Sequence, residues 1–298
     1  MTAAHRSDLA DRIAAAPISW GVCEVPGWGY QLTPDRVLAE MSDLGVAATE
    51  FGPDGFLAAD PETKARQLAD HGLRAVGGFV PVLLHEETVD PLPTVLKELE
   101  SYAAAGATRL VLSADTGQLG YDSQPTLTES QWSTLLGNLD RLAAAAAAVG
   151  VLASLHPHVG TNVESADDVE RVLAGSSIGL CLDTGHLLIG GTDPVRLAMT
   201  QTARISHVHL KDVRRGIADR VRNGELSYSA AVANGLYTPL GMGDIDIATI
   251  VNALEAAGYD GYYVLEQDTM LHSEPKPTEG PAHDVRRSIE FITRVTRP

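Results

Sequence analysis

The stretch Ile205-Ser206-His207-Val208-His209-Leu210-Lys211-Asp212 combines a short apolar strand with a charged end. Successive side chains of a strand point to opposite faces, so His207 and His209 share one face. Two further apolar runs end in the same way, Leu180-Cys181-Leu182-Asp183-Thr184-Gly185-His186 and Tyr262-Tyr263-Val264-Leu265-Glu266-Gln267-Asp268. If these strands are parallel neighbours in one barrel, their charged ends converge. The three segments therefore predict one shared pocket.

Strand-like runs alternate with helical patterns along the whole chain. The expected strands cover residues 17–20, 47–51, 75–80, 109–113, 152–156, 178–183, 205–210 and 262–266. Strands that alternate with helices imply parallel pairing, and eight such units in 298 residues predict an α/β fold, a (β/α)8 TIM barrel in a single domain over residues 1–298. An open doubly wound sheet is the alternative. No strand here is followed by the Gly-x-Gly-x-x-Gly turn typical of that fold.

Helix ends are marked by capping residues. Asp60-Pro61 and Asp193-Pro194 place a capping side chain before a proline, which lacks the N–H that the first helical residue cannot use. Residues 213–243 are too long for an ordinary connection between a strand and a helix, and residues 227–234 within them suggest a short helix. An insertion at the carboxyl face of a barrel predicts a lid over the pocket.

Composition and charge limit the functional classes. A formal net charge of −17 argues against a nucleic-acid partner, whose binding surface should be basic. No stretch approaches the length of a membrane span, and residues 1–16 lack the apolar core of a signal peptide. Cys23 and Cys181 do not form a disulfide framework. These features predict a cytoplasmic protein that acts on a small molecule. They are compatible with a homo-oligomer as well as with a monomer.

The residues at the expected strand ends favour metal chemistry. The candidates are Trp20, Glu50, His156, His158, Asp183, His186, His209, Lys211 and Glu266. A single histidine is more often a structural residue, but convergence of carboxylates and imidazoles from several strands predicts a divalent-metal site. These ligand types do not select the metal. We expect Mn²⁺ or Co²⁺, with Mg²⁺ or Zn²⁺ as alternatives.

Several candidates have two readings. His207 sits one residue pair deeper than His209, which favours core packing or a bond to a ligand. Lys211 is either a surface residue or a lysine kept for its point charge in a chain that otherwise prefers arginine. Glu50 either contacts substrate hydroxyls or forms an internal ion pair. Trp20 either forms a wall of the pocket or lies in the core.

At these residues the chain resembles a known superfamily. The segments that carry the resemblance are Pro17-Ile18-Ser19-Trp20, His156-Pro157-His158-Val159-Gly160-Thr161, Cys181-Leu182-Asp183-Thr184-Gly185-His186, His207-Val208-His209-Leu210-Lys211-Asp212, Gly241-Met242-Gly243-Asp244-Ile245-Asp246 and Leu265-Glu266-Gln267. They are similar to segments of the sugar-phosphate isomerase/epimerase superfamily, the xylose-isomerase-like barrels, and within it to the inosose dehydratase family. The resemblance spans essentially the whole chain.

The resemblance implies a metal-binding pattern of Glu, Asp, His and Glu from the last four strands. Asp183, His209 and Glu266 match three of these ligands. His186 matches a substrate-binding histidine of ketose epimerases, and Arg215 falls near the position of their substrate-binding arginine. The chain departs from the pattern on the fifth strand. His156, followed two residues later by His158, stands where the epimerases carry glutamate.

The resemblance implies a metal-dependent lyase that dehydrates 2-keto-myo-inositol. A dehydration needs a base for the proton next to the ketone and an acid for the departing hydroxide. His156 or His158 is the candidate acid and Lys211 or Glu266 the candidate base, while His156 is equally well the fourth metal ligand. The alternatives are a ketose 3-epimerase or aldose–ketose isomerase and, from another class, a non-catalytic sugar-binding barrel.

Overall fold

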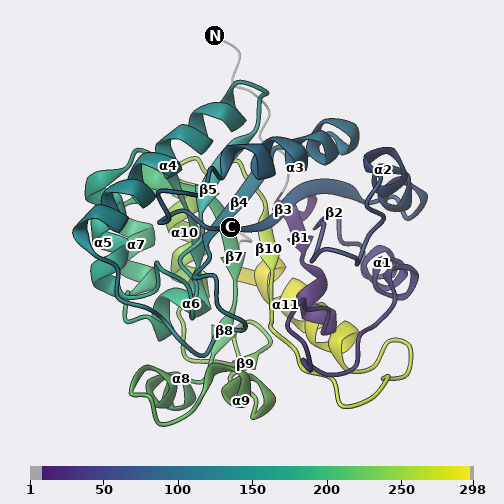
Figure 1. Cartoon of the computed structure of the whole chain (residues 1–298). Coiled ribbons are helices and arrows are strands. Elements are labelled where there is room, and N and C mark those ends of the chain that lie inside the picture. Colours follow the sequence, from purple (N-terminus) through teal and green to yellow (C-terminus); the bar gives the residue numbers. More distant parts are fainter. Residues whose placement is uncertain (1–8, 296–298) are drawn as a thin grey trace.

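A closed barrel of eight parallel strands forms the centre of the molecule (Figure 1). The structure, a computed structural model, describes residues 9–295. The barrel strands are β1 (Ile13–Ala15), β2 (Ala48–Glu50), β3 (Arg74–Val82), β4 (Arg109–Ala114), β5 (Leu152–Leu155), β6 (Gly179–Asp183), β7 (Ile205–Leu210) and β10 (Tyr263–Leu265). β1 pairs with both β2 and β10, which closes the ring. The predicted (β/α)8 architecture is confirmed.

The first strand lies earlier than the sequence pattern suggested. Residues 13–15 form β1, whereas Pro17–Trp20, predicted as the strand, form a 3₁₀ helix that ends at Gly21 with φ of +80°. Proline cannot donate a backbone hydrogen bond to a neighbouring strand, so Pro17 opens the short helix instead. The prediction of a strand at residues 17–20 was therefore wrong, because the strand precedes these residues and a 3₁₀ helix takes their place.

Helices surround the barrel and cover its outer face (Figure 1). They are α1 (Pro34–Asp43), α2 (Pro61–Asp70), α3 (Leu92–Ala105), α4 (Glu129–Ala147), α5 (Ala166–Gly175), α6 (Thr184–Ile189), α7 (Pro194–Thr200), α10 (Ile247–Ala256) and α11 (Pro281–Val295). The Asp60 and Asp193 side chains cap α2 and α7, as predicted. Capping keeps these helix starts in place because it satisfies backbone N–H groups that have no partner inside the helix.

Small side chains fill part of the barrel interior and leave room for charged groups above them. Ala14 on β1 pairs with Ala48 on β2, and both are fully buried. Residues two apart on a strand share a face, so Glu50 follows Ala48 into the barrel. The β2–β3 register shifts between Thr49 and Glu50, where Glu50 pairs with Gly77. The extra residue at this shift is Val76 of β3, so the irregularity bends β3 and leaves Glu50 on the face that Ala48 occupies.

The long connection after β7 forms a separate small unit beside the barrel. It contains β8 (Asp212–Val213), α8 (Arg215–Arg222), α9 (Tyr228–Ala233) and β9 (Tyr237–Thr238), and Figure 1 shows both helices outside the ring of barrel helices. The Asp212 carboxylate accepts hydrogen bonds from the backbone N–H groups of Gly241 and Gly243 at 2.9 Å each. These bonds fasten the end of the insertion to its beginning.

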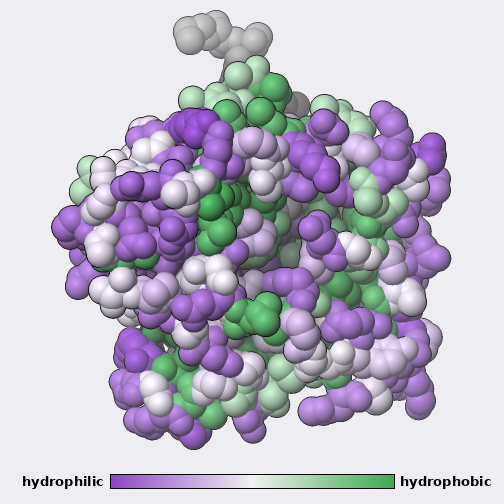
Figure 2. Space-filling model, viewed as in Figure 1, coloured by the Kyte–Doolittle hydropathy of each residue, from purple (hydrophilic) through white to green (hydrophobic). Residues whose placement is uncertain are grey.

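The visible face is mainly hydrophilic, with apolar side chains gathered around a central hollow over the barrel (Figure 2). Within residues 9–295, no helix is both long enough and apolar enough to cross a membrane. The segment without a signal-peptide core is residues 1–16, and its first half, residues 1–8, lies outside the described residues.

Candidate metal centre

Four side chains from neighbouring strands meet at one point inside the barrel mouth. His156 directly follows β5, Asp183 ends β6, His209 lies on β7 and Glu266 directly follows β10. One potential ligand atom from each residue lies within 4.8 Å of the corresponding atoms of the others. The resemblance implied Asp183, His209 and Glu266 as metal ligands and left His156 as either the fourth ligand or an acid. The structure brings them together in a group that is able to hold a cation.

The polar atoms of this group fit a divalent cation. His156 Nε2 lies 3.2 Å from Asp183 Oδ2, and His209 Nδ1 lies 2.5 Å from Glu266 Oε2. Despite this proximity, His209 Nδ1 and Glu266 Oε2 have no partner in hydrogen-bond geometry among the described residues. Buried polar atoms are rarely left without a partner. A cation between imidazole nitrogen and carboxylate oxygens would satisfy both atoms.

Glu50 supports this group from below. Its Oε1 accepts hydrogen bonds from His207 Nε2 at 2.8 Å and His209 Nε2 at 2.9 Å. Burial alone would raise the pKa of Glu50, but the charges and hydrogen bonds of both histidines outweigh burial and lower the pKa. A carboxylate on one ring nitrogen leaves the other free to bind a metal. The carboxylate thus orients His209 Nδ1 toward Asp183 and Glu266. Contact of Glu50 with substrate hydroxyls remains a prediction.

Asp183 has two tasks, one for each carboxylate oxygen. Oδ1 accepts hydrogen bonds from the backbone N–H groups of Gly185 and His186, both at 2.9 Å, and so caps α6. Oδ2 faces His156 and lies 3.7 Å from His209 Nδ1. The turn from β6 into α6 therefore fixes the direction of the oxygen available to a metal.

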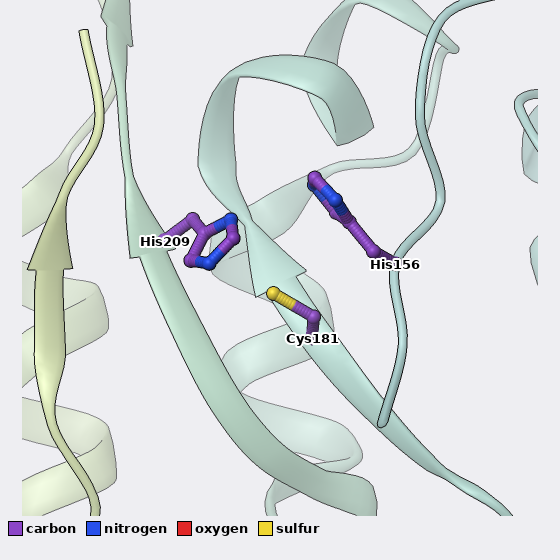
Figure 3. A group of neighbouring side chains, drawn as sticks. All are labelled: His156, Cys181 and His209. Atoms are coloured by element: carbon purple, nitrogen blue, oxygen red, sulfur yellow. The ribbon is translucent and has the colours of Figure 1, made fainter. Parts of the chain in front are cut away.

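Cys181 lies one residue pair below Asp183 on β6. Figure 3 shows its thiol pointing from β6 toward the His209 ring, with His156 on the other side. These three residues form a second, overlapping set of possible ligand atoms within 4.8 Å of one another. Burial raises the pKa of Cys181 to about 11, which keeps the thiol protonated at neutral pH. Cys181 is fully buried.

Lys211 is a buried ammonium group surrounded by carboxylates. Its Nζ donates to Asp268 Oδ1 and lies 3.4 Å from Glu266 Oε2 and 3.7 Å from Asp183 Oδ2. Burial would lower the pKa of Lys211, but the charges of Asp268, Glu266 and Asp183 raise it well above its usual value. Lys211 is therefore not a surface residue but a fixed positive charge beside the metal group.

A cavity of about 80 Å³ opens onto this group. The residues lining it include Cys23, Glu24, Trp28, Glu50, Phe79, Tyr121, His156, His158, Lys211, Tyr228, Glu266 and Asp268. Pockets that bind small molecules usually measure roughly 300–1,000 Å³. The cavity is therefore small for a ligand pocket, and Tyr228 of α9 forms part of its wall.

His158 and His186 stack beside the cavity, with their ring centroids 3.7 Å apart. His158 Nδ1 lies 2.7 Å from the Val159 carbonyl oxygen, so this nitrogen carries the proton of a neutral ring. Burial, with added repulsion from His156 and Lys211, lowers the pKa of His158 well below its usual value. His186 does not line the cavity, and its Nε2 lies 3.2 Å from Lys211 Nζ.

Two predicted substrate-binding residues lie away from the cavity. Trp20 is fully buried in the core, where its Nε1 donates to Glu40 Oε2 at 2.9 Å. Arg215 begins α8 and lines a different cavity, together with Arg222. The two residues are misplaced for different reasons. The Trp20 prediction assumed a strand where a 3₁₀ helix forms, and α8 carries Arg215 away from the barrel mouth.

Sequence reasoning missed several residues of the cavity. Asp268 and Tyr228 contact each other, and Phe79 and Tyr121 flank His158. Asp268 had a detectable signal, since it lies two residues after Glu266 at a strand end. Phe79 lies on β3, but nothing in the sequence marked that strand as part of the site. Tyr121 and Tyr228 had no signal, because they come from connections whose paths depend on tertiary packing.

Comparisons with known proteins agree with this fold. A sequence model described as "Xylose isomerase-like TIM barrel" matches residues 38–295. The inosose dehydratase of Geobacillus kaustophilus (strain HTA426) is 34% identical over 272 residues, covering 86% of this chain and 87% of that protein.

Solved structures share the fold at low sequence identity. An L-ribulose 3-epimerase superposes with a TM-score of 0.69 at 18% identity, covering 95% of this chain and 94% of that one. The IOLI protein, solved with a bound zinc atom, superposes with a TM-score of 0.68 at 13% identity, covering 95% and 97%. The sequence match over most of the chain, together with the barrel itself, shows that the chain belongs to the xylose isomerase-like TIM barrel family.

Proposed function

We propose that the protein is a metal-dependent hydro-lyase that removes water from a cyclic polyol ketone such as 2-keto-myo-inositol. The single observation that carries the proposal is the asymmetry of the site. A metal group with His156 at the end of its fifth strand stands beside the buried ammonium of Lys211, 3.4 Å from Glu266. The similarity to an inosose dehydratase over most of the chain supports the choice of substrate class.

His156, Asp183, His209 and Glu266 would hold the cation, for which Mn²⁺ and Co²⁺ are our first candidates. A bound divalent cation would polarise the ketone oxygen and so acidify the neighbouring C–H bond. We assign His156 to the metal rather than to proton transfer, since its Nε2 faces Asp183 Oδ2. This leaves proton transfer to residues that line the cavity.

We give Lys211 and His158 the opposite roles from those expected from the sequence, and Glu266 remains a candidate base. Three carboxylates around Lys211 Nζ favour the charged ammonium, which suits a donor to the departing hydroxide better than a base. His158 has its proton on Nδ1, so its Nε2 is a lone-pair acceptor in the cavity wall. We therefore assign His158 or Glu266 as the base that takes the proton next to the ketone.

A ketose epimerase needs a different arrangement. It must remove a proton from one face of a carbon and return one to the other, which calls for matched groups on both sides. His156 and Glu266 differ in charge and basicity, so dehydration should exceed epimerisation. We further expect the enzyme to act in the cytoplasm on the free polyol.

The test is to incubate metal-loaded enzyme with 2-keto-myo-inositol and, separately, with ketohexoses in deuterated water. We expect a product that has lost one water from the inosose and gains the absorbance of a dione. The ketohexoses should return unchanged. Rapid formation of a deuterated ketose epimer, without dehydration of the inosose, would replace the proposal by the epimerase.

A further inference from the structure

Asp268 is a buried carboxylate that the metal group does not use. Its exposed fraction is 7%, and it lies two residues beyond the ligand Glu266. Oδ1 accepts a hydrogen bond from Lys211 Nζ, and Oδ2 accepts one from the hydroxyl of Tyr228. Burying an isolated carboxylate costs free energy. The two hydrogen-bond donors offset that cost and so fix the position of the Asp268 side chain.

The first donor would have other partners without Asp268. Lys211 Nζ lies within 3.7 Å of both Glu266 and Asp183, which belong to the metal group. If Asp268 were absent, the ammonium would pair with these two carboxylates alone and compete with the cation for them. Asp268 thus holds the ammonium at the side of the metal group, facing the cavity.

The second donor comes from the insertion. Tyr228 lies on α9, and its hydroxyl is 3.0 Å from the hydroxyl of Tyr237 on β9. The Tyr237 ring also packs 5.4 Å from Lys211 Nζ. Both tyrosines are buried in this arrangement, in which the insertion lies against the barrel. Opening of α9 would remove the Tyr228 hydroxyl from Asp268 and expose the carboxylate to water.

From this geometry we infer that Asp268 is a positioning residue that couples closure of residues 213–243 to the placement of the Lys211 ammonium. The closed insertion fixes Asp268 through Tyr228, and Asp268 fixes Lys211 beside the metal group. The ammonium is therefore in place when the cavity is closed and free to move when α9 lifts. The catalytic consequence rests on the proposed dehydration, whereas the structural coupling does not.

The test compares two tyrosine-to-phenylalanine variants of the metal-loaded enzyme. Tyr228→Phe removes the hydroxyl that reaches Asp268. Tyr30→Phe is the matched control, because the Tyr30 hydroxyl also bonds a carboxylate, Glu274 at 2.9 Å, but outside the cavity. The first readout is the rate of reductive methylation of Lys211, measured by mass spectrometry against Lys276, whose side chain is 83% exposed. The second readout is kcat and KM for dehydration of the inosose.

We expect Tyr228→Phe to speed methylation of Lys211 and to lower kcat roughly tenfold with a smaller change in KM, since a hydrogen bond to a charged group is lost. Tyr30→Phe should match the parent in both readouts. Parent-like methylation of Lys211 in Tyr228→Phe would overturn the coupling. Faster methylation with an unchanged kcat would overturn its catalytic role.

A double-mutant cycle separates coupling from two local effects. If Asp268 links Tyr228 to Lys211, the double variant Asp268→Asn with Tyr228→Phe should lose no more kcat than the more damaging of the two single variants. Additive losses would contradict the link. If the parent does not dehydrate the inosose, the proposed function fails, while the methylation rates still decide whether the insertion positions Lys211.

Discussion

Asp183 links local backbone structure to metal binding through two oxygens of one side chain. Oδ1 caps α6, and Oδ2 faces the other ligands. Replacement of this residue thus has two separable effects, one on the helix start and one on the metal. A matched pair of substitutions distinguishes them.

Asp183→Asn should remove the metal and keep the fold. Asparagine is as good a helix cap as aspartate, but its neutral amide is a poor ligand next to two imidazoles. We expect the ion content to fall from about one per chain toward zero, with dehydration lost. Asp183→Ala should also lose the cap and cost about 1 kcal/mol more in unfolding free energy. Metal analysis and chemical denaturation measure the two effects. Full metal occupancy in Asp183→Asn would refute the ligand assignment.

Glu50→Gln should weaken metal binding without changing a ligand. Glu50 orients His209 and stabilises its charge distribution, and loss of such a supporting carboxylate typically costs 10–100-fold in metal affinity. Glu40→Gln is the control, because Glu40 is another buried carboxylate, bonded to Trp20 and Arg36 away from the metal group. Competition with a metal chelator gives both affinities. Equal affinities in the two variants would mean that Glu50 does not support the ligand.

At the scale of elements, strand contacts decide where side chains enter the barrel. Gly77 on β3 has φ of +152°, and a Cβ there would lie 1.6 Å from the carbonyl oxygen of Arg109 on β4. The same glycine pairs with Glu50 at the register shift. The close approach of β3 to β4 therefore depends on the missing side chain, and it helps to fix the strand that carries Glu50.

Gly77→Ala should destabilise the protein by roughly 3 kcal/mol or more, because the backbone would have to move to admit a methyl group. Gly137→Ala provides the opposite case. Gly137 lies inside α4 with nothing within 4 Å of an added Cβ, so alanine should stabilise the helix by about 1 kcal/mol. Urea denaturation of both variants tests the pair. A Gly77→Ala protein as stable as the parent would show that β3 and β4 have room to separate.

Local patterns in the sequence were sufficient for most elements. Helix caps such as Asp60 and Asp193 and the apolar runs of seven strands depend on neighbours in the chain, and the structure confirms them. The first strand was misplaced because Ile13–Ala15 is short and rich in alanine, and only pairing with β2 and β10 makes it a strand. Pairing between distant segments has no local signal.

The residues of the candidate site also fall into two groups, those with a local signal in the sequence and those placed by tertiary packing. His156, Asp183, His209 and Glu266 were predictable because each comes directly at a strand end, and a barrel brings strand ends together. Arg215 was expected near the substrate because of its place in the sequence, but α8 lies beside the barrel. Tyr228 could be assigned to a short helix, yet its contact with Asp268 depends on how the whole insertion folds back.

At the scale of the whole molecule, the insertion and the barrel together enclose the reactive groups. Tyr228 reaches Asp268, and Ser229 Oγ donates to Asp122 Oδ2 at 2.8 Å in the connection after β4. The resulting cavity of about 80 Å³ is smaller than ligand pockets generally are. Entry of a six-membered polyol ring thus requires part of this enclosure to move.

Limited proteolysis should detect that movement. We propose that residues 213–243 act as a lid, so a protease should cut them in the free enzyme and cut more slowly when substrate is bound. Residues 272–280 form an internal control, because this loop lies outside the insertion and is largely exposed. Cleavage of the insertion that is unchanged by substrate, at a constant rate in the control loop, would identify a static element instead.

The small volume of the cavity also affects the rate at which substrate binds. A substrate that must wait for the enclosure to open cannot bind faster than the opening itself. In stopped-flow mixing, the observed binding rate should therefore rise with substrate concentration at first and then level off at a ceiling set by the protein. An open mouth would give a rate that keeps rising in proportion to concentration. The height of that ceiling is the rate at which the empty barrel opens.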